Sequence, residues 1–283
     1  MNPQEQKQSP LGLFGPGIGA LLIAREVLRE GEANSIVCFS DRRNSPFSTR
    51  SDSEIISLID SGLEILSTFG VSQIVIGCNT SSRYLERVQA ERDKCARPHF
   101  DCVDLIPITV EAISSMEQQK LLLLGSPVIG REKIYTRALS PLSSKVITEV
   151  GLTGIAADLD TSSSLSPPVK DETARTLKTL FQECKPDAVV NVCTHFDLVT
   201  DFISGLAQEA LGVVLPVYQQ STLVAPLLRQ VLGLRCSSAG MEPLALADLE
   251  VVTNVSDPSY HAHIRELFAP YFKPTISVTA EQC

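Results

Sequence analysis

The segment QIVIGCNT, residues 73–80, decides the fold expected of this chain, and AVVNVCTH, residues 188–195, repeats its pattern. Each segment is a short apolar run that ends in a cysteine, Cys78 or Cys193, followed at once by small polar side chains. An apolar run of this length that stops at a polar turn predicts a buried strand. In open α/β sheets, ligands bind at the carboxyl ends of the strands. The two segments therefore predict two thiols at sheet edges, one on either side of a small molecule.

A sulfur on each side of one carbon suits a reaction that removes a proton from one face and delivers a proton to the other. A lone buried cysteine is most often a small apolar residue of the core. The repeated context favours the chemical interpretation for Cys78 and Cys193. The remaining cysteines keep the structural interpretation, as reduced thiols: Cys38, Cys95, Cys102, Cys184, Cys236 and Cys283.

Composition excludes several classes of protein. The chain has 283 residues, enough for two α/β domains or one large one, with hydrophobic and charged fractions of 43% and 20% that are ordinary for a globular protein. A net charge of −9 and the absence of Trp argue against nucleic-acid binding. No segment is apolar over a membrane-spanning length, and the polar N-terminus does not resemble a secretory signal. We expect a cytoplasmic protein without a nucleic-acid or membrane partner.

The cysteines and histidines do not predict a metal site. Eight cysteines spread over this length lack the density of a disulfide scaffold and show no close metal-type pairing. His261 and His263 alternate on a predicted surface helix and would point apart. We therefore expect no bound metal.

Strand and helix patterns alternate along the chain, which predicts an α/β fold with parallel sheets and helical crossovers. The predicted strands are 11–14, 35–40, 73–77, 100–103, 121–125, 146–150, 188–192, 213–217 and 250–253. The predicted helices are 20–30, 51–69, 84–94, one that opens at Pro107, 134–139, 171–183 and 261–268, with a Ser/Pro-rich loop at 161–168.

The glycine-rich segment GPGIG, residues 15–19, lies between a predicted strand and a predicted helix. A dinucleotide-binding loop has this location, but its glycine spacing differs, and Pro16 removes a backbone donor that would face a phosphate. A loop whose glycines let the backbone approach a small ligand is the favoured interpretation.

Several segments, in order along nearly the whole chain, resemble the cofactor-independent glutamate racemases of the aspartate/glutamate racemase superfamily. The most specific are Cys78-Asn79-Thr80, identical to that family's first catalytic motif, and residues 193–196, close to its second motif, Cys-Thr-His-Tyr. The weaker matches are residues 13–19, similar to the family's Phe-Asp-Ser-Gly-Val-Gly; Asp41 with residues 46–48, similar to Asp…Pro-Tyr-Gly; Gly125-Ser126 with Tyr135, similar to Gly-Thr…Tyr; and the tail 251–268.

The resemblance implies two pseudo-symmetric α/β domains with parallel sheets flanked by helices and the active site in the cleft between them. The first domain would comprise residues 1–105 plus 217–283, and the second 106–216. The implied activity is amino-acid racemisation without pyridoxal phosphate or another cofactor, in which one cysteine thiolate takes the α-proton and the other, as a thiol, reprotonates the opposite face. Glutamate or aspartate is the default substrate, and a homodimer is the implied assembly.

The resemblance also implies a role for each site residue. Cys78 and Cys193 would be the acid/base pair, with helix N-termini lowering the pKa of each thiol, and His195 would assist on the side of Cys193. The other expected residues bind substrate: Asn79, Thr80 and Thr194 at its carboxylate, Pro46, Phe47 and Ser48 at its side chain, and Gly15 and Pro16 in the opening segment.

Departures from the family pattern leave further activities open. Gly15-Pro16 stands where the family has Asp-Ser, Val192 replaces a glycine before the second cysteine, and Asp197 replaces a proline after it. The family aspartate contacts the substrate amine, so its loss makes a less polar or N-modified amino acid an alternative to the default substrate. A related isomerase or decarboxylase activity, or a catalytically weakened ligand-binding role, is also compatible with these departures.

Overall fold

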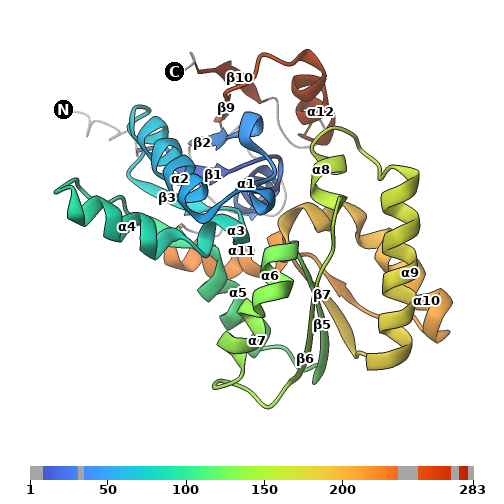
Figure 1. Cartoon of the computed structure of the whole chain (residues 1–283). Coiled ribbons are helices and arrows are strands. Elements are labelled where there is room, and N and C mark those ends of the chain that lie inside the picture. Colours follow the sequence, from blue (N-terminus) through green and yellow to red (C-terminus); the bar gives the residue numbers. More distant parts are fainter. Residues whose placement is uncertain (1–8, 31–34, 235–247, 269–273, 280–283) are drawn as a thin grey trace, which may run out of the picture.

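The computed structural model describes residues 9–30, 35–234, 248–268 and 274–279. In this part of the chain, two parallel sheets are flanked by helices (Figure 1), so the predicted α/β fold is confirmed. The six-stranded sheet has the order β10-β9-β2-β1-β3-β4 and the four-stranded sheet the order β6-β5-β7-β8. Cys236 and Cys283 lie outside the described residues.

The strands of the first sheet are β1 (Leu11–Gly15), β2 (Ser35–Ser40), β3 (Gln73–Ile76), β4 (Cys102–Asp104), β9 (Asp248–Thr253) and β10 (Thr275–Val278). Those of the second are β5 (Lys120–Gly125), β6 (Val146–Gly151), β7 (Ala188–Val192) and β8 (Val217–Tyr218). The central strands β3, β5 and β7 are almost entirely buried, as continuous apolar runs in parallel sheets should be. Strand β8 pairs in parallel with β7 and forms one edge of the second sheet.

The larger helices are α1 (Gly19–Glu30), α2 (Asp52–Ser67), α4 (Leu85–Lys94), α5 (Leu105–Ser114), α9 (Pro167–Cys184), α10 (Thr200–Leu211), α11 (Gln220–Val231) and α12 (Pro258–Phe268). The short ones are η1 (Arg42–Asn44), η2 (Phe47–Thr49), α3 (Asn79–Ser82), α6 (Pro127–Glu132), α7 (Ile134–Leu139), α8 (Ile155–Leu159) and η3 (Thr194–Val199). None of the helices in the described part of the chain is long and apolar enough to cross a membrane.

Local sequence explains where several helices begin. Helix α2 starts with a capping box, in which the Ser51 hydroxyl accepts from the amide of Glu54 and the Glu54 carboxylate accepts from the amide of Ser51. Helices α6 and α9 each begin with proline, whose missing N–H costs nothing in a first turn. These signals lie within four residues of each start, so they can be recognised in the sequence.

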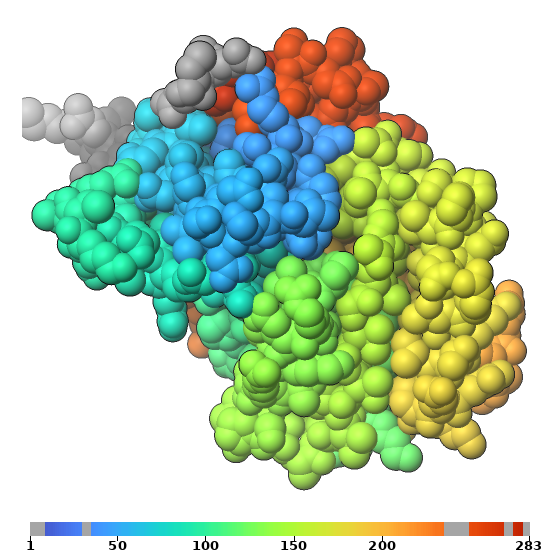
Figure 2. Space-filling model, in the orientation of Figure 1, coloured from blue at the N-terminus to red at the C-terminus, as the bar shows by residue number. Residues whose placement is uncertain are grey.

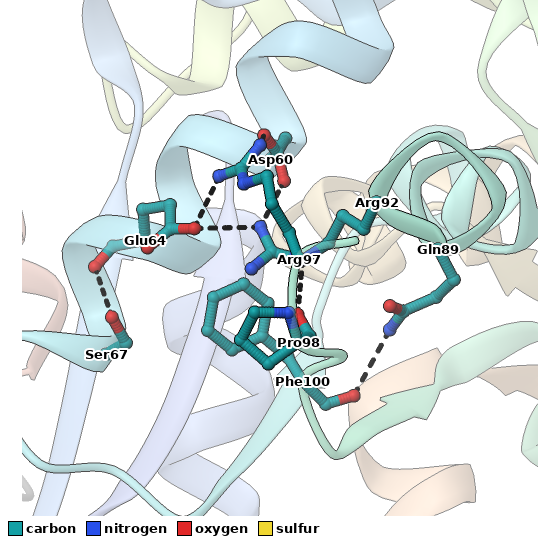
Figure 3. Close-up of polar contacts among 8 residues, drawn as sticks. All are labelled: Asp60, Glu64, Ser67, Gln89, Arg92, Arg97, Pro98 and Phe100. Carbon is teal, nitrogen blue, oxygen red and sulfur yellow. Dashed lines mark hydrogen bonds and ion pairs between the residues drawn. The ribbon is translucent and has the colours of Figure 1, made fainter. Parts of the chain in front are cut away.

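A buried arginine fixes α4 to α2, as Figure 3 shows. The Arg92 side chain is 2% exposed and donates to the carboxylates of Asp60 at 2.6 Å and Glu64 at 2.8 Å. Arg97 pairs with the same two acids, and the Arg92 guanidinium lies 4.2 Å from the centre of the Phe100 ring. Because two cations face two anions, the buried charge is compensated on the outer side of the first sheet.

The two sheets share one apolar core. A single cluster of buried side chains includes Leu13 and Leu21 near the first sheet and Leu124 and Leu228 near the second. Helix α11 packs against both α1 and α5, between the sheets (Figure 1). We call the first sheet with its helices the first unit, and the second sheet with its helices the second unit. In Figure 2, the blue surface of the first unit meets the green and yellow surface of the second unit along a seam.

The C-terminal helix α12 departs from its predicted environment. His263 was expected on a surface, yet its side chain is buried and its Nε2 donates to the backbone oxygen of Leu159 at 2.8 Å. The expectation was wrong because α12 packs beside α8, a helix of the other unit. The residues around His263 in the sequence do not indicate this long-range contact. Figure 1 shows the two helices next to each other.

Candidate active site

Cys78 lies at the carboxyl end of β3, directly before α3, as predicted. Its thiol is half-buried, and the residue before it, Gly77, has no room for a side chain because an added Cβ would lie 2.8 Å from Ala20 Cα on α1. The pKa of Cys78 is raised above its usual value, because burial outweighs the lowering effect of Ser81. The expected lowering of this thiol's pKa by a helix N-terminus is therefore not found at Cys78. The end of β3 is thus held against α1, with the sulfur at the edge of the first sheet.

Cys193 holds the matching place in the second sheet, at the carboxyl end of β7 and directly before η3. The two cysteines share one backbone conformation, with φ −134° and ψ 121° at Cys78 and φ −146° and ψ 118° at Cys193. They also interact electrostatically, because the charge of Cys193 raises the pKa of Cys78 and that of His195 lowers it. Cys78, Cys193 and His195 are therefore close enough for their charges to interact.

His195 forms a buried pair with an acid that the sequence did not single out. Its Nε2 lies 2.9 Å from Oδ1 of Asp160, and the two side chains are 8% and 1% exposed. Burial lowers the pKa of His195, but the charge and hydrogen bond of Asp160, together with Cys193, raise it well above its usual value. Burial raises the pKa of Asp160, but its partners hold it below the usual range. The raised pKa of His195 and the lowered pKa of Asp160 favour an imidazolium–carboxylate pair next to Cys193.

Asp160 also joins the two halves of the structure. Its carboxylate accepts from the backbone amide of Ile18 at 3.0 Å and from the Ser45 hydroxyl at 2.6 Å, both of which belong to the first unit. Two further contacts cross the seam near Cys78: the hydroxyls of Thr80 and Ser126 lie 3.1 Å apart, and Arg83 forms an ion pair with Glu132. These contacts link the two halves of the structure near the two cysteine motifs.

The glycine-rich segment makes room for this arrangement. A Cβ at Gly17 would lie 2.1 Å from Asp160 Oδ1, and one at Gly19 would lie 2.3 Å from Thr194 Oγ1 and 2.8 Å from His195 Nδ1. Gly15 and Pro16 are both buried, and a Cβ at Gly15 would lie 2.8 Å from that of Ala20. The close neighbours of Gly17 and Gly19 are Asp160 and the second cysteine motif, whereas Gly15 lies against Ala20 of α1.

The predicted carboxylate-binding residues are placed around the cysteines. The Asn79 side chain donates to Gln220 Oε1 at 2.7 Å and accepts from Gln220 Nε2 at 3.0 Å and from the Tyr135 hydroxyl. The hydroxyl of Thr194 donates to the Gly77 carbonyl at 3.3 Å, beside Cys78. Asn79 and Thr194 thus each link one cysteine motif to the other half of the structure.

The predicted loop 46–48 lies against α3, next to the Cys78 motif. Phe47 is 1% exposed, and its ring centre lies 6.2 Å from that of Phe14, so the ring packs in the core of the first sheet. Pro46 and Ser48 are half-buried. Ser45, just before this loop, makes the contact with Asp160, and sequence reasoning missed it along with Asp160 and Gln220.

No family model matches the chain. It is similar to glutamate racemases of Trichodesmium erythraeum, with 26% identity over 78% of this chain and 80% of that protein, and of Trichormus variabilis, with 25% identity over 75% and 71%. The fold is similar to that of a Francisella tularensis glutamate racemase solved in complex with D-glutamate, with a TM-score of 0.74, 16% identity and coverage of 96% and 97%. A Picrophilus torridus aspartate racemase has a TM-score of 0.55 at 16% identity, over 81% and 95% of the two chains.

These findings confirm the predicted resemblance to glutamate racemases and are consistent with the aspartate/glutamate racemase superfamily. The structural neighbours confirm the fold of two parallel sheets flanked by helices. The relatives are isomerases that act without pyridoxal phosphate, and an isomerase of this kind is the class of enzyme that the comparisons support.

Proposed function

We propose that this protein is a cofactor-independent amino-acid racemase in which Cys78 and Cys193 are the opposed acid and base, with glutamate or aspartate as the default substrate. The observation that carries the proposal is the pairing of the two cysteines. Each ends a buried parallel strand in the same backbone conformation, and their charges interact. A thiolate on one side takes the α-proton, and a thiol on the other side gives a proton to the opposite face of the carbanion.

The surrounding residues support the two proton transfers unequally. On the side of Cys193, the imidazolium of His195 supplies a proton and a positive charge, and Asp160 fixes its orientation. On the side of Cys78, Ser81 offsets part of the rise that burial causes in the pKa of the thiol. Donors already in place for a developing charge need no rearrangement during the reaction, which lowers its barrier.

A less polar or N-modified amino acid is the second candidate substrate. Gly15 and Pro16 supply no acid in the opening segment, and the carboxylate of Asp160 is already occupied by Ile18, Ser45 and His195. A free ammonium group would therefore have to be met by other acceptors. The proposal also includes a cytoplasmic location and a homodimer, which rest on the sequence and the resemblance, and light scattering of the purified protein would measure its assembly.

Incubation with single amino acids in heavy water tests the proposed function. The wild-type protein should invert its substrate and place deuterium at the α-carbon. Cys78→Ser and Cys193→Ser should each abolish inversion, and each should retain exchange only with the enantiomer that faces its remaining thiol. Cys95→Ser changes an exposed cysteine on the outer surface and should behave as wild type. Binding of an amino acid without any α-exchange would instead identify a binding protein.

A further inference from the structure

Asp197 ties the second cysteine motif to helix α11. It lies four residues after Cys193, and its side chain is buried. Its two carboxylate oxygens accept from the backbone amides of Gln220 and Ser221, each at 2.9 Å, in the first turn of α11. Asn191 on β7 donates to the same carboxylate at 3.3 Å. A carboxylate at a helix N-terminus meets unpaired amides and the positive end of the helix dipole, so this contact fixes the start of α11.

Gln220 continues the connection to the first cysteine motif. Its side chain is fully buried and forms a reciprocal amide pair with Asn79, the residue directly after Cys78, at 2.7 and 3.0 Å. The same Nε2 donates to the Thr109 hydroxyl at 2.8 Å and lies 3.3 Å from that of Tyr135. A chain of hydrogen bonds therefore runs from the Cys193 motif through Asp197 and Gln220 to the Cys78 motif.

Only an amide of this length completes the chain. It supplies a donor and an acceptor to the Asn79 amide and keeps a donor for Thr109. An apolar side chain of similar volume would fill the space but leave the buried amide of Asn79 with fewer partners, and buried polar groups without partners are costly. The Asn79 side chain, and with it the turn that carries Cys78, would then take another position.

We propose that Gln220, held by Asp197, is a positioning residue that sets the spacing between the two cysteine motifs. The inference rests on the proposed function, because spacing matters only if both thiols act on one carbon. Proton removal needs one thiol in place, whereas inversion needs both. Loosening the connection should therefore impair inversion more than exchange.

The test measures both quantities in heavy water with one enantiomer as substrate. In wild type, deuterium should appear mainly in the inverted product. In Gln220→Met, inversion should fall roughly tenfold to a hundredfold, the cost of a displacement of about 1 Å. Deuterium in the recovered starting enantiomer should fall less, so the ratio of exchange to inversion rises. A general loss of folded protein would lower both and leave this ratio unchanged.

Two further variants keep the result interpretable. Gln230→Met makes the same change at an exposed position near the far end of α11, and its ratio should equal that of wild type. Thr109→Val is nearly isosteric and removes one acceptor of Gln220, so the ratio of exchange to inversion should rise, but less than in Gln220→Met. This variant provides the test if Gln220→Met folds poorly. A wild-type ratio in both Gln220→Met and Thr109→Val would overturn the positioning role. Absence of both exchange and inversion in the wild-type protein would overturn the proposed function itself.

Discussion

Gly17→Ala adds only a methyl group and should disrupt the Asp160–His195 ion pair. The new Cβ would lie 2.1 and 2.4 Å from the two carboxylate oxygens of Asp160, far inside van der Waals contact. Asp160 is buried and held by three donors, the Ile18 amide, the Ser45 hydroxyl and the His195 ring, at 2.6–3.0 Å. A shift of a few tenths of an ångström cannot relieve such an overlap. The side chain must leave its site and give up these partners.

The magnitude follows from the burial of the pair. Removing one partner of a buried ion pair costs about 3–5 kcal/mol, so the free energy of unfolding should fall by about that amount. The pair raises the pKa of His195 and lowers that of Asp160. Its stabilisation is therefore complete above the usual Asp range, about 4, and below the usual His value, about 6.5. It is lost as the pH rises through the raised pKa of His195, and the effect of the variant should shrink there.

Urea unfolding at pH 5.5 and at alkaline pH measures the loss, and NMR titration of His195 should show its pKa falling in Gly17→Ala, because burial remains while the carboxylate has moved. Gly205→Ala is the matched control: it lies in α10 with nothing within 4 Å of the added Cβ, and it should stabilise the protein by about 0.5–1 kcal/mol. Wild-type stability at pH 5.5 together with an unchanged His195 titration would refute the role assigned to Gly17.

Three further substitutions test other parts of the structure. Burial raises the pKa of Asp197 to about 6, so the folded protein binds this proton at higher pH than the unfolded chain does. Between pH 7 and pH 4, the free energy of unfolding of wild type, measured in urea, should therefore rise by up to about 3 kcal/mol relative to that of Asp197→Asn. Parallel pH dependences of the two proteins would contradict this. Arg92→Met breaks a buried ion pair and should lower the free energy of unfolding by about 3 kcal/mol in the same assay. The control Arg87→Met breaks an exposed ion pair and should cost under about 1 kcal/mol. Equal losses in the two variants would show that burial does not matter. Ser81→Ala removes a group that lowers the pKa of Cys78, so alkylation of Cys78 near neutral pH should slow and its pH profile should move upward; an unchanged profile would exclude the hydroxyl as a donor to the thiolate.

The sequence predicted the cysteine motifs because all their signals are local. The apolar runs, the turn after each cysteine and the following helix start fall within about ten residues, and the structure places Cys78 and Cys193 as expected. The partners of these motifs are not local. Asp160 is 35 residues from His195, beside a Ser/Pro-rich loop, and Gln220 is 141 residues from Asn79. A single acid or amide in a polar segment carries no pattern that marks it as buried.

Among the larger helices, α10 and α11 were missed for a different reason. Helix α10 contains Gly205, and α11 contains Pro226, both of which are unfavourable inside helices. Helix α11 nevertheless forms because its N-terminus is fixed by Asp197 and its apolar face, with Val224 and Leu228, is buried in the shared core. Tertiary packing therefore overrides local preference in the segment that carries Gln220.

The departure from the family pattern at Gly15 involves a second residue. The methyl group of Ala20 lies 2.8 Å from the position of a Cβ at Gly15 and equally close to one at Gly77. An aspartate introduced at Gly15 would therefore collide with α1, and overpacking of this kind costs about 1–3 kcal/mol. Gly15→Asp alone should be unstable, whereas Gly15→Asp with Ala20→Gly should regain much of that stability in urea unfolding. If a free ammonium group is part of the substrate, only the double variant should gain activity on glutamate. Equal stability of the single and double variants would show that Ala20 does not constrain Gly15.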